Sequence, residues 1–251
     1  MQLFQTDGIV LKSHNLAESD RIVVLYTKQS GFIRGVAHGA RRLKSKFGGS
    51  LEPFTLIAIA YSEKEGRDLV TISSTDIKHS LFGQASRPEL LSAFGYLANL
   101  MERFSPPHEP NERLFRLLTA LTEALGRSEC DIEGATRYFE IWLLKLSGFL
   151  PDLRKCFRCN SQLGVTAVFQ DSELRLFCFN CSAGRGLRIS SEAHSLACKA
   201  LSVSPVQFAA DFRVVDKNSR ENLRGFSKKY IERVLETDPT KMLTAEYKTA
   251  S

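Results

Sequence analysis

Short apolar runs, separated by turn residues, fill the first 80 positions of the chain. Several runs alternate apolar and polar side chains, which is typical of strands with one buried face. The second and fourth runs are apolar on both faces, which indicates a curled sheet whose outer surface is also covered. The five predicted strands are 3–12, 21–27, 32–39, 54–62 and 68–79.

The connection between the third and fourth predicted strands is longer than an ordinary hairpin loop, whereas residues 28–31 suit a tight turn with Gly31 at positive φ. Five short strands with one long connection favour an OB-fold barrel. A small SH3-like barrel remains the alternative, because periodicity does not separate the two.

From residue 86 the apolar period changes to that of helices. Residues 86–89 read as a capping box with Pro88 just inside the helix, and Asp131 is expected to cap a third helix. Three apolar stripes predict a helical core: Leu90, Phe94, Leu97 and Met101; Leu114, Leu117, Leu118, Leu121 and Leu125; Ile132, Ala135, Phe139, Trp142, Leu146 and Phe149.

Two more helices are predicted near the end of the chain. Ser190 or Ser191 caps one that runs through Ala200, and a capping box at 218–221 opens the other. The last helix has an apolar stripe and, opposite it, a basic face that we interpret as solvated. The stripe is Leu223, Phe226, Tyr230 and Val234, and the basic face is Arg224, Lys228, Lys229 and Arg233.

Between these helical segments lie two pairs of cysteines, Cys156 with Cys159 and Cys178 with Cys181, in the pattern C-x2-C-x18-C-x2-C. Each C-x2-C turn places two thiolates on one knuckle, and two knuckles complete a tetrahedral zinc site. The residues between the pairs predict a hairpin closed over Asp171-Ser172-Glu173, which is the layout of a zinc ribbon. Four thiolates leave no open position on the metal, so the predicted zinc, one per chain, is structural.

Disulfides, a thioredoxin-like redox pair and unpaired core thiols are the other readings of these cysteines. No secretory signal accompanies them, a redox pair does not need a second C-x2-C, and core thiols have no reason to repeat a motif. Cys130 and Cys198 fall in helical patterns and are expected to be buried thiols. No apolar run is long enough to span a membrane, and the composition fits a reducing cytoplasm.

These elements predict an α+β, multidomain chain. The predicted parts are an OB-fold domain at 1–80, a helical domain at 81–150 and 186–238, a zinc ribbon inserted at 151–185, and a disordered tail at 239–251.

The net charge of +6 is unevenly distributed: residues 22–51 contain no Asp or Glu at all. This window holds a loop with glycines near both ends, whose cations can follow a phosphate backbone. A loop that is basic by chance, or paired with acidic helices, is the alternative. The predicted nucleic-acid-binding residues are Arg34, Arg41, Arg42, Lys44 and Lys46.

Alternation on the third strand places Phe32 and Arg34 on one face, which suits base stacking and phosphate contact, although Phe32 could equally belong to the core. A further alternative makes the ribbon the DNA contact, through Lys155, Arg158, Arg175 and Arg185. These four cations could simply offset the charge of the metal-bound thiolates.

Phosphate-binding loops of the G-x-x-x-x-G-K-[ST] type, G-x-S-x-G elbows and H-E-x-x-H motifs do not occur in the sequence. Together these absences favour a binding protein over an enzyme, and we expect no catalytic residue.

Several segments in order resemble the RecO family of bacterial DNA repair proteins, to about residue 240. The segments are T-D-G-I-V-L at 6–11, A-E-S-D-R at 17–21, G-F-I-R-G-V-A-H-G-A-R-R at 31–42, K-S-K at 44–46, S-L-E-P-F at 50–54, L-S-G-F-L-P at 146–151, and the cysteine pairs.

The resemblance implies a recombination mediator that binds single- and double-stranded DNA and anneals complementary strands. It also implies work with RecR, and help in loading RecA onto strands covered by single-strand binding protein, whose C-terminal tail docks on the helical domain. A nucleoid-associated place in the bacterial cytoplasm would follow. Some family members lack the cysteines, which implies that the metal supports the fold. An RNA-binding OB-fold protein, and a metal-dependent nuclease with a supporting ribbon, are the rival readings.

Overall fold

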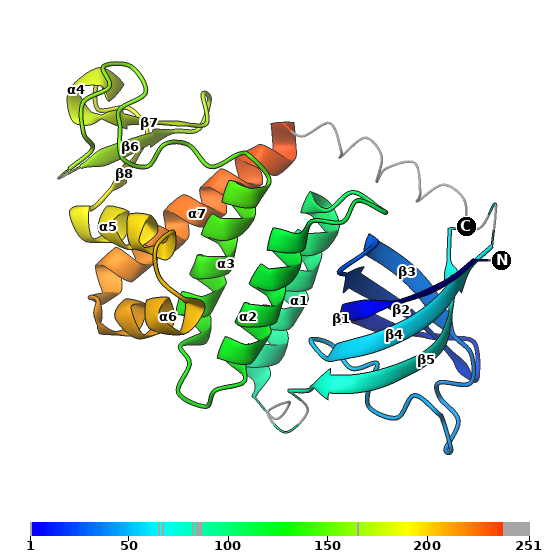
Figure 1. Cartoon of the computed structure of the whole chain (residues 1–251). Coiled ribbons are helices and arrows are strands. Elements are labelled where there is room, and N and C mark those ends of the chain that lie inside the picture. The colour runs from blue at the N-terminus through cyan, green and yellow to red at the C-terminus, as the bar shows by residue number, and fades with distance from the viewer. Residues whose placement is uncertain are drawn as a thin grey trace. The chain divides into compact units, whose positions relative to one another are not determined.

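A computed structural model describes residues 2–64, 66, 68–81, 83, 87–164 and 166–237. The chain forms two compact units, Met1–Ser128 and Glu129–Ser251 (Figure 1). The division falls between the second and third helices, within the segment that the sequence groups into one helical domain. The predicted tail at 239–251 lies outside the described residues.

The first unit is built on five strands: β1 (Gln2–Leu16), β2 (Asp20–Thr27), β3 (Gly31–Ala37), β4 (Leu56–Glu63) and β5 (Val70–His79). They close into a barrel in the order β1-β2-β3-β5-β4, with β1 also pairing with β4. All the pairings are antiparallel except β3 with β5, which run parallel at Gly35–Val70 and Val36–Thr71. This order confirms the OB-type barrel and removes the SH3-like alternative.

The barrel interior is tightly packed at Gly35. A Cβ atom there would lie 2.9 Å from the side chains of both Val70 and Ile72, so β3 and β5 can approach only where this side chain is absent. Around this point the core contains Val10, Val23, Leu25, Ile33, Ala37, Ile57 and Ile59.

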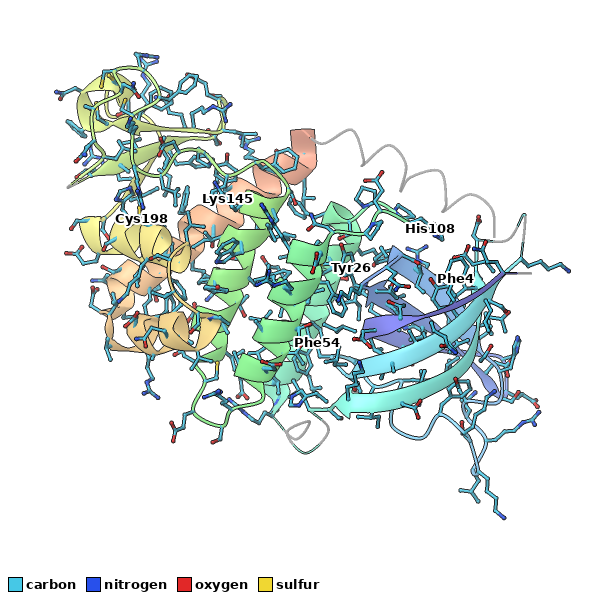
Figure 2. The ribbon with its side chains drawn as sticks, viewed as in Figure 1. Phe4, Tyr26, Phe54, His108, Lys145 and Cys198 are labelled. Carbon is cyan, nitrogen blue, oxygen red and sulfur yellow. The ribbon has the colours of Figure 1, made fainter. Side chains whose placement is uncertain are left out.

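Apolar residues on the outer face of the barrel are covered within the same unit, as the two-sided pattern predicts. Helix α1 (Pro88–Phe104) stacks Phe94 on Phe54 with ring centroids 4.2 Å apart. The Tyr26 hydroxyl accepts a hydrogen bond from the backbone N–H of Asn111, and Figure 2 labels Tyr26 and Phe54 on this covered side. Phe32 is only 4 % exposed and forms a bridge with Pro107, so it belongs to the core and does not stack bases.

The start of α1 differs from the prediction. Its N-cap is Arg87, which makes no side-chain capping bond, and Pro88 opens the helix; Ser86 lies outside the described residues. Helix α2 (Glu112–Leu125) is capped instead by Asn111, whose side chain accepts from Leu114 N at 3.1 Å.

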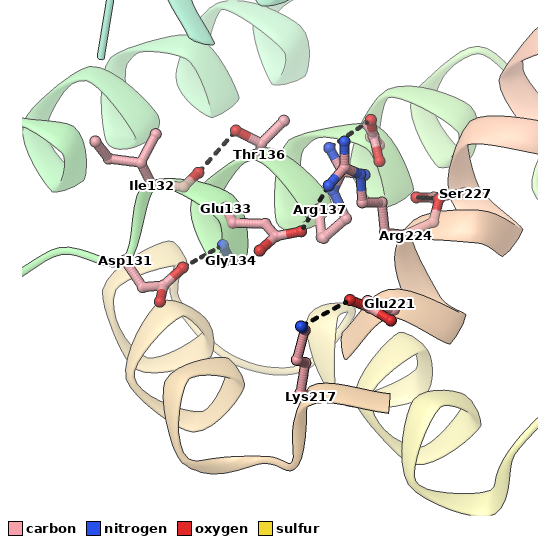
Figure 3. Close-up of polar contacts among 11 residues, drawn as sticks. Asp131, Ile132, Glu133, Gly134, Thr136, Arg137, Lys217, Glu221, Arg224 and Ser227 are labelled. Carbon is pink, nitrogen blue, oxygen red and sulfur yellow. Dashed lines mark hydrogen bonds and ion pairs between the residues drawn. The ribbon is translucent and has the colours of Figure 1, made fainter. Parts of the chain in front are cut away.

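The second unit contains helices α3 (Ile132–Leu146), α5 (Ser191–Ala200), α6 (Pro205–Val214) and α7 (Lys217–Thr237). Asp131 caps α3 by accepting from Gly134 N at 2.7 Å, as predicted (Figure 3). Ser190 caps α5, which settles the choice between the two serines.

Two helical predictions were wrong. Helix α6 was missed, and it packs so closely on α3 that a Cβ at Gly134 would lie 3.0 Å from Ala209 and Phe212. Helix α7 begins before the predicted capping box, because the Asp216 carboxylate accepts from Ser219 N at 3.0 Å.

The basic face of α7 is matched by acids within its own unit. Arg233 and Lys229 both contact Asp171, and Lys228 pairs with Glu232 along the helix. Arg224 reaches Glu133 of α3 at 3.8 Å (Figure 3). This supports the interpretation of a solvated, ion-paired helix face. No helix among the described residues is both long and apolar enough to cross a membrane.

Gly35→Val should destabilise the chain by about 1–3 kcal/mol, because the added side chain overfills the barrel interior. Thermal unfolding of the full chain measures the effect. Gly49→Ala is the matched control, since a Cβ there meets nothing within 4 Å. Equal unfolding temperatures for Gly35→Val and the parent chain would contradict the packing constraint.

Candidate nucleic-acid interface and metal centre

The connection between β3 and β4 is anchored at its far end in the barrel interior. Phe47 and Leu51 are 3 % and 1 % exposed and belong to the barrel core. Ser50 Oγ donates to Phe47 O at 2.6 Å and lies 2.5 Å from Thr75 Oγ1. Apart from Gly48 and Gly49, the exposed part of the connection therefore precedes Phe47.

Asp20 anchors the near end of the same connection. Its Oδ1 accepts from Gly39 N at 2.8 Å, and its Oδ2 lies 2.7 Å from His38 Nδ1. Gly39 has φ +71°, a conformation that favours glycine. Sequence reasoning missed Asp20 as an anchor, yet a signal existed: the β2–β3 register pairs Arg21 with Ala37, so continuing it by one residue places Asp20 opposite His38.

The hydrogen bond from Gly39 N, followed by those from His38 and Ser19, lowers the pKa of Asp20 from 3.8 to about 2. A lowered folded-state pKa gives stability that is present above pH 3.8 and is lost as the pH falls through about 2. The anchor is therefore intact at neutral pH.

The predicted cations of the loop are exposed between these two anchors. Among the described residues, no carboxylate forms an ion pair with Arg41, Arg42, Lys44 or Lys46. Arg41 Nη1 donates to Ala17 O at 2.7 Å, which holds that side chain without neutralising it. We define these four cations as the basic loop. They present an unmatched positive surface, which is what a phosphate backbone requires.

Arg34 differs from the cations of the basic loop because it forms an ion pair with a carboxylate. Its guanidinium forms an ion pair of 2.5 Å with Glu102 of α1, which also binds Lys12. Partial burial would raise the pKa of Glu102, but the bonds from Lys12 and Arg34 outweigh burial and lower it. Arg34 is thus already neutralised, although 46 % of its side chain is exposed.

The four predicted metal ligands come together in the second unit. The Sγ atoms of Cys156, Cys159, Cys178 and Cys181 all lie within 4.8 Å of one another. The Cys159 and Cys178 sulfurs are 3.8 Å apart, which matches the edge of about 3.8 Å of a tetrahedron with metal–sulfur bonds of about 2.3 Å. The cluster therefore fits one tetrahedral metal ion.

The pKa values of the cysteine thiols are also consistent with a bound cation. Hydrogen bonding from Ser161 lowers the pKa of Cys159 to about 6. Hydrogen bonds with the neighbouring Cys178 and Cys159 raise the pKa of Cys181 to about 12, which favours its protonated thiol. A bound divalent metal replaces the thiol protons and lets all four sulfurs ionise.

The ribbon around the cluster agrees with the predicted hairpin and adds a strand. Strands β6 (Ala167–Gln170) and β7 (Arg175–Cys178) pair across the predicted turn, and the short helix α4 (Phe179–Ser182) carries the second knuckle. Strand β8 (Leu187–Ile189), which was not predicted, pairs with the other edge of β6. Val165, at the predicted start of the hairpin, lies outside the described residues.

The closed barrel places the chain in the class of OB-type proteins, here joined to a helical unit with a four-cysteine ribbon. Family models described as "Recombination protein O N terminal" and "Recombination protein O C terminal" match residues 1–81 and 85–243. The chain belongs to the RecO family of DNA repair proteins.

Its curated relatives carry the name DNA repair protein RecO. That of Koribacter versatilis is 32 % identical over 200 residues, covering 78 % of this chain and 79 % of the relative. That of Geobacter metallireducens is 35 % identical over 198 residues, covering 78 % and 79 %. That of Dehalococcoides mccartyi is 33 % identical over 192 residues, covering 76 % and 75 %.

Asp20→Ala should weaken DNA binding more than Asp20→Asn, because the amide oxygen can still accept from Gly39 N while alanine releases the loop. Fluorescence anisotropy with a labelled single-stranded oligonucleotide measures both. Both variants remove the same negative charge, so a difference between their DNA affinities reports on the hydrogen bond to Gly39 N and not on charge. If charge alone mattered, both would bind more tightly than the parent chain and equally so.

The purified chain should retain about one divalent metal ion, which Cys159→Ser should reduce severalfold by removing one of four ligands. Elemental analysis after gel filtration provides the measurement. Cys198→Ser is the control, because this thiol lies outside the cluster. Full metal content in Cys159→Ser would refute the four-thiolate site.

Proposed function

We propose that the chain is a non-enzymatic, DNA-binding recombination mediator in DNA repair. It binds single- and double-stranded DNA, anneals complementary strands, and acts with RecR to help load RecA onto strands covered by single-strand binding protein. Membership of the RecO family supports this proposal. The observation that carries the DNA-binding part is the basic loop, four exposed cations without an acidic partner among the described residues.

The basic loop suits a partner that is recognised by charge and not by sequence. Each phosphate that a lysine or arginine neutralises releases counterions, so affinity comes from the backbone common to all DNA. A mediator must act on any sequence, and interactions of this kind provide that. Arg34 adds to the surface through its exposed part, but less than the loop does, because Glu102 already balances its charge.

The metal is zinc in this proposal, and its role is structural. Thiolates suit zinc, and four of them fill its coordination shell, which leaves no place for water or substrate. When bound, zinc supplies folding free energy to the ribbon. The chain's own cysteines hold the two knuckles together between α3 and α5.

Partner binding falls to the helical parts of the chain. The C-terminal tail of single-strand binding protein docks on a helical surface, and RecR binds the chain in the loading complex. These assignments rest on family membership, and no residue is assigned to them.

Two rivals are separated by direct experiments. An RNA-binding role would appear as preference for RNA when DNA and RNA of equal length compete. A nuclease would degrade DNA only when Mg²⁺ or Mn²⁺ is added. Annealing of strands coated with single-strand binding protein, at the same rate with and without ATP, is the result expected of a mediator.

Replacing Arg41, Arg42, Lys44 and Lys46 together by glutamine should weaken binding to all DNA sequences alike. For each phosphate that is no longer neutralised, the slope of log affinity against log salt should fall by about 0.7 on single strands and about 0.9 on duplex. Anisotropy titrations at several salt concentrations give both quantities.

The matched control replaces Lys217, Arg224, Lys228 and Lys229 of α7 by glutamine, the same change in net charge on cations that are paired. The control should retain most of the affinity and slope. Equal reductions in the two variants would mean that net charge, and not the basic loop, governs binding.

A further inference from the structure

The metal end of the ribbon exposes two phenylalanines at equivalent positions of its two knuckles. Phe157 follows Cys156, and Phe179 follows Cys178. Their side chains are 60 % and 48 % exposed, whereas the ribbon phenylalanines Phe169 and Phe177 are 1 % and 0 % exposed. Phe169 and Phe177 thus form the ribbon core, while the knuckle rings leave much of their surface in water.

Guanidinium groups lie over these rings. Arg175 is 5.3 Å from the Phe157 ring centroid, and Arg188 is 5.0 Å from that of Phe179. Arg158 lies 5.4 Å from Phe177, which meets Phe157 edge to face at 5.9 Å. Phe177 and Phe157 are therefore adjacent rings, with Arg158 over the first and Arg175 over the second.

An ion-paired acid lies at the hairpin turn of the ribbon, whereas the cations of the knuckles are not ion-paired to any residue that the structure describes. The acids Asp171 and Glu173 lie at the hairpin turn, and Arg233 and Lys229 of α7 bind Asp171 there. At the metal end, Arg158 and Arg188 are exposed, and Arg158 is fixed by donating to Cys181 O at 2.9 Å. Within the described part of the chain, no ion pair joins a carboxylate to Lys155, Arg158, Arg175 or Arg188.

Offsetting the metal centre does not account for this arrangement. Residues 151–190 carry six basic and three acidic side chains, an excess that remains positive after the two negative charges of a zinc tetrathiolate. Charge balance also gives no reason for aromatic rings on the surface. Arginine planes and exposed rings side by side are what unstacked bases and their phosphates require.

We propose that the metal end of the ribbon is a second binding surface for single-stranded DNA. Phe157 and Phe179 stack on bases, and Arg158, Arg175 and Arg188 contact phosphates. Duplex DNA is excluded as the preferred ligand, because its base faces are already stacked. This surface extends the proposed function, and it does not depend on the basic loop. One chain would then hold two segments of nucleic acid, which annealing requires.

The test replaces both knuckle rings by alanine, with Phe157→Tyr and Phe179→Tyr together as the ring-retaining control. Anisotropy is measured with oligothymidine and with an abasic oligonucleotide of equal length, in the parent chain and in the loop variant with four glutamines. The alanine variant should bind oligothymidine about tenfold or more weakly, given typical base–aromatic stacking. The tyrosine variant should retain its affinity, and abasic binding should change little between them.

Metal content and thermal unfolding show whether the alanine variant keeps its ribbon. The proposal is overturned if a fully metallated alanine variant binds oligothymidine like the parent chain, or if abasic and normal strands are weakened equally. The proposal that the basic loop binds DNA can fail separately. In that case the loop variant binds DNA like the parent chain, while the alanine variant still binds oligothymidine more weakly. Where unfolding removes the metal from the alanine variant, Phe157→Leu with Phe179→Leu tests the same removal of stacking.

Discussion

Barrel closure through the parallel contact of β3 with β5 is the constraint on which the first unit depends. Because β5 lies between β3 and β4, the chain cannot turn directly from β3 into β4 and must cross one end of the barrel. Phe47 and Leu51 enter the core on the way. The exposed residues of the crossing lie mainly before Phe47, so the same crossing that closes the barrel leaves the basic stretch in solvent.

Local sequence signals predicted the strands, the metal ligands and the starts of α3 and α5. Asp131 caps α3 and the C-x2-C pairs meet, because these depend on residues only a few positions apart or on a repeated motif. Helix α6 was missed although Ser204 caps it and its buried Pro205, Phe208, Ala209 and Phe212 stand at helical spacing, because the helix is short and Val206 and Val214, apolar but not buried, obscure the stripe. Its formation depends on packing against Gly134, which is distant in sequence.

The number of basic residues in a segment was a weaker guide to a candidate DNA-binding surface than whether each basic residue has an acidic partner. Arg34 and the cations of α7 look as promising as the basic loop when the residues are counted, yet Glu102 and Asp171 neutralise much of their charge. Such partners are far away along the chain, so composition could not reveal them. Arg34 lies in the same acid-free window as the loop. The loop differs because, among the described residues, no distant acid forms an ion pair with its cations.

The two anchors of the basic loop have a mechanical consequence. Asp20 and Phe47 fix where the segment begins and ends, while the side chains between them make few contacts with the barrel. The cations are thereby confined to a small volume without being locked into one arrangement. In the proposed DNA-binding role, such a tether would keep the effective concentration of the cations near a strand high without imposing a single spacing of phosphates. The same residues would then fit both an extended single strand and a regular duplex.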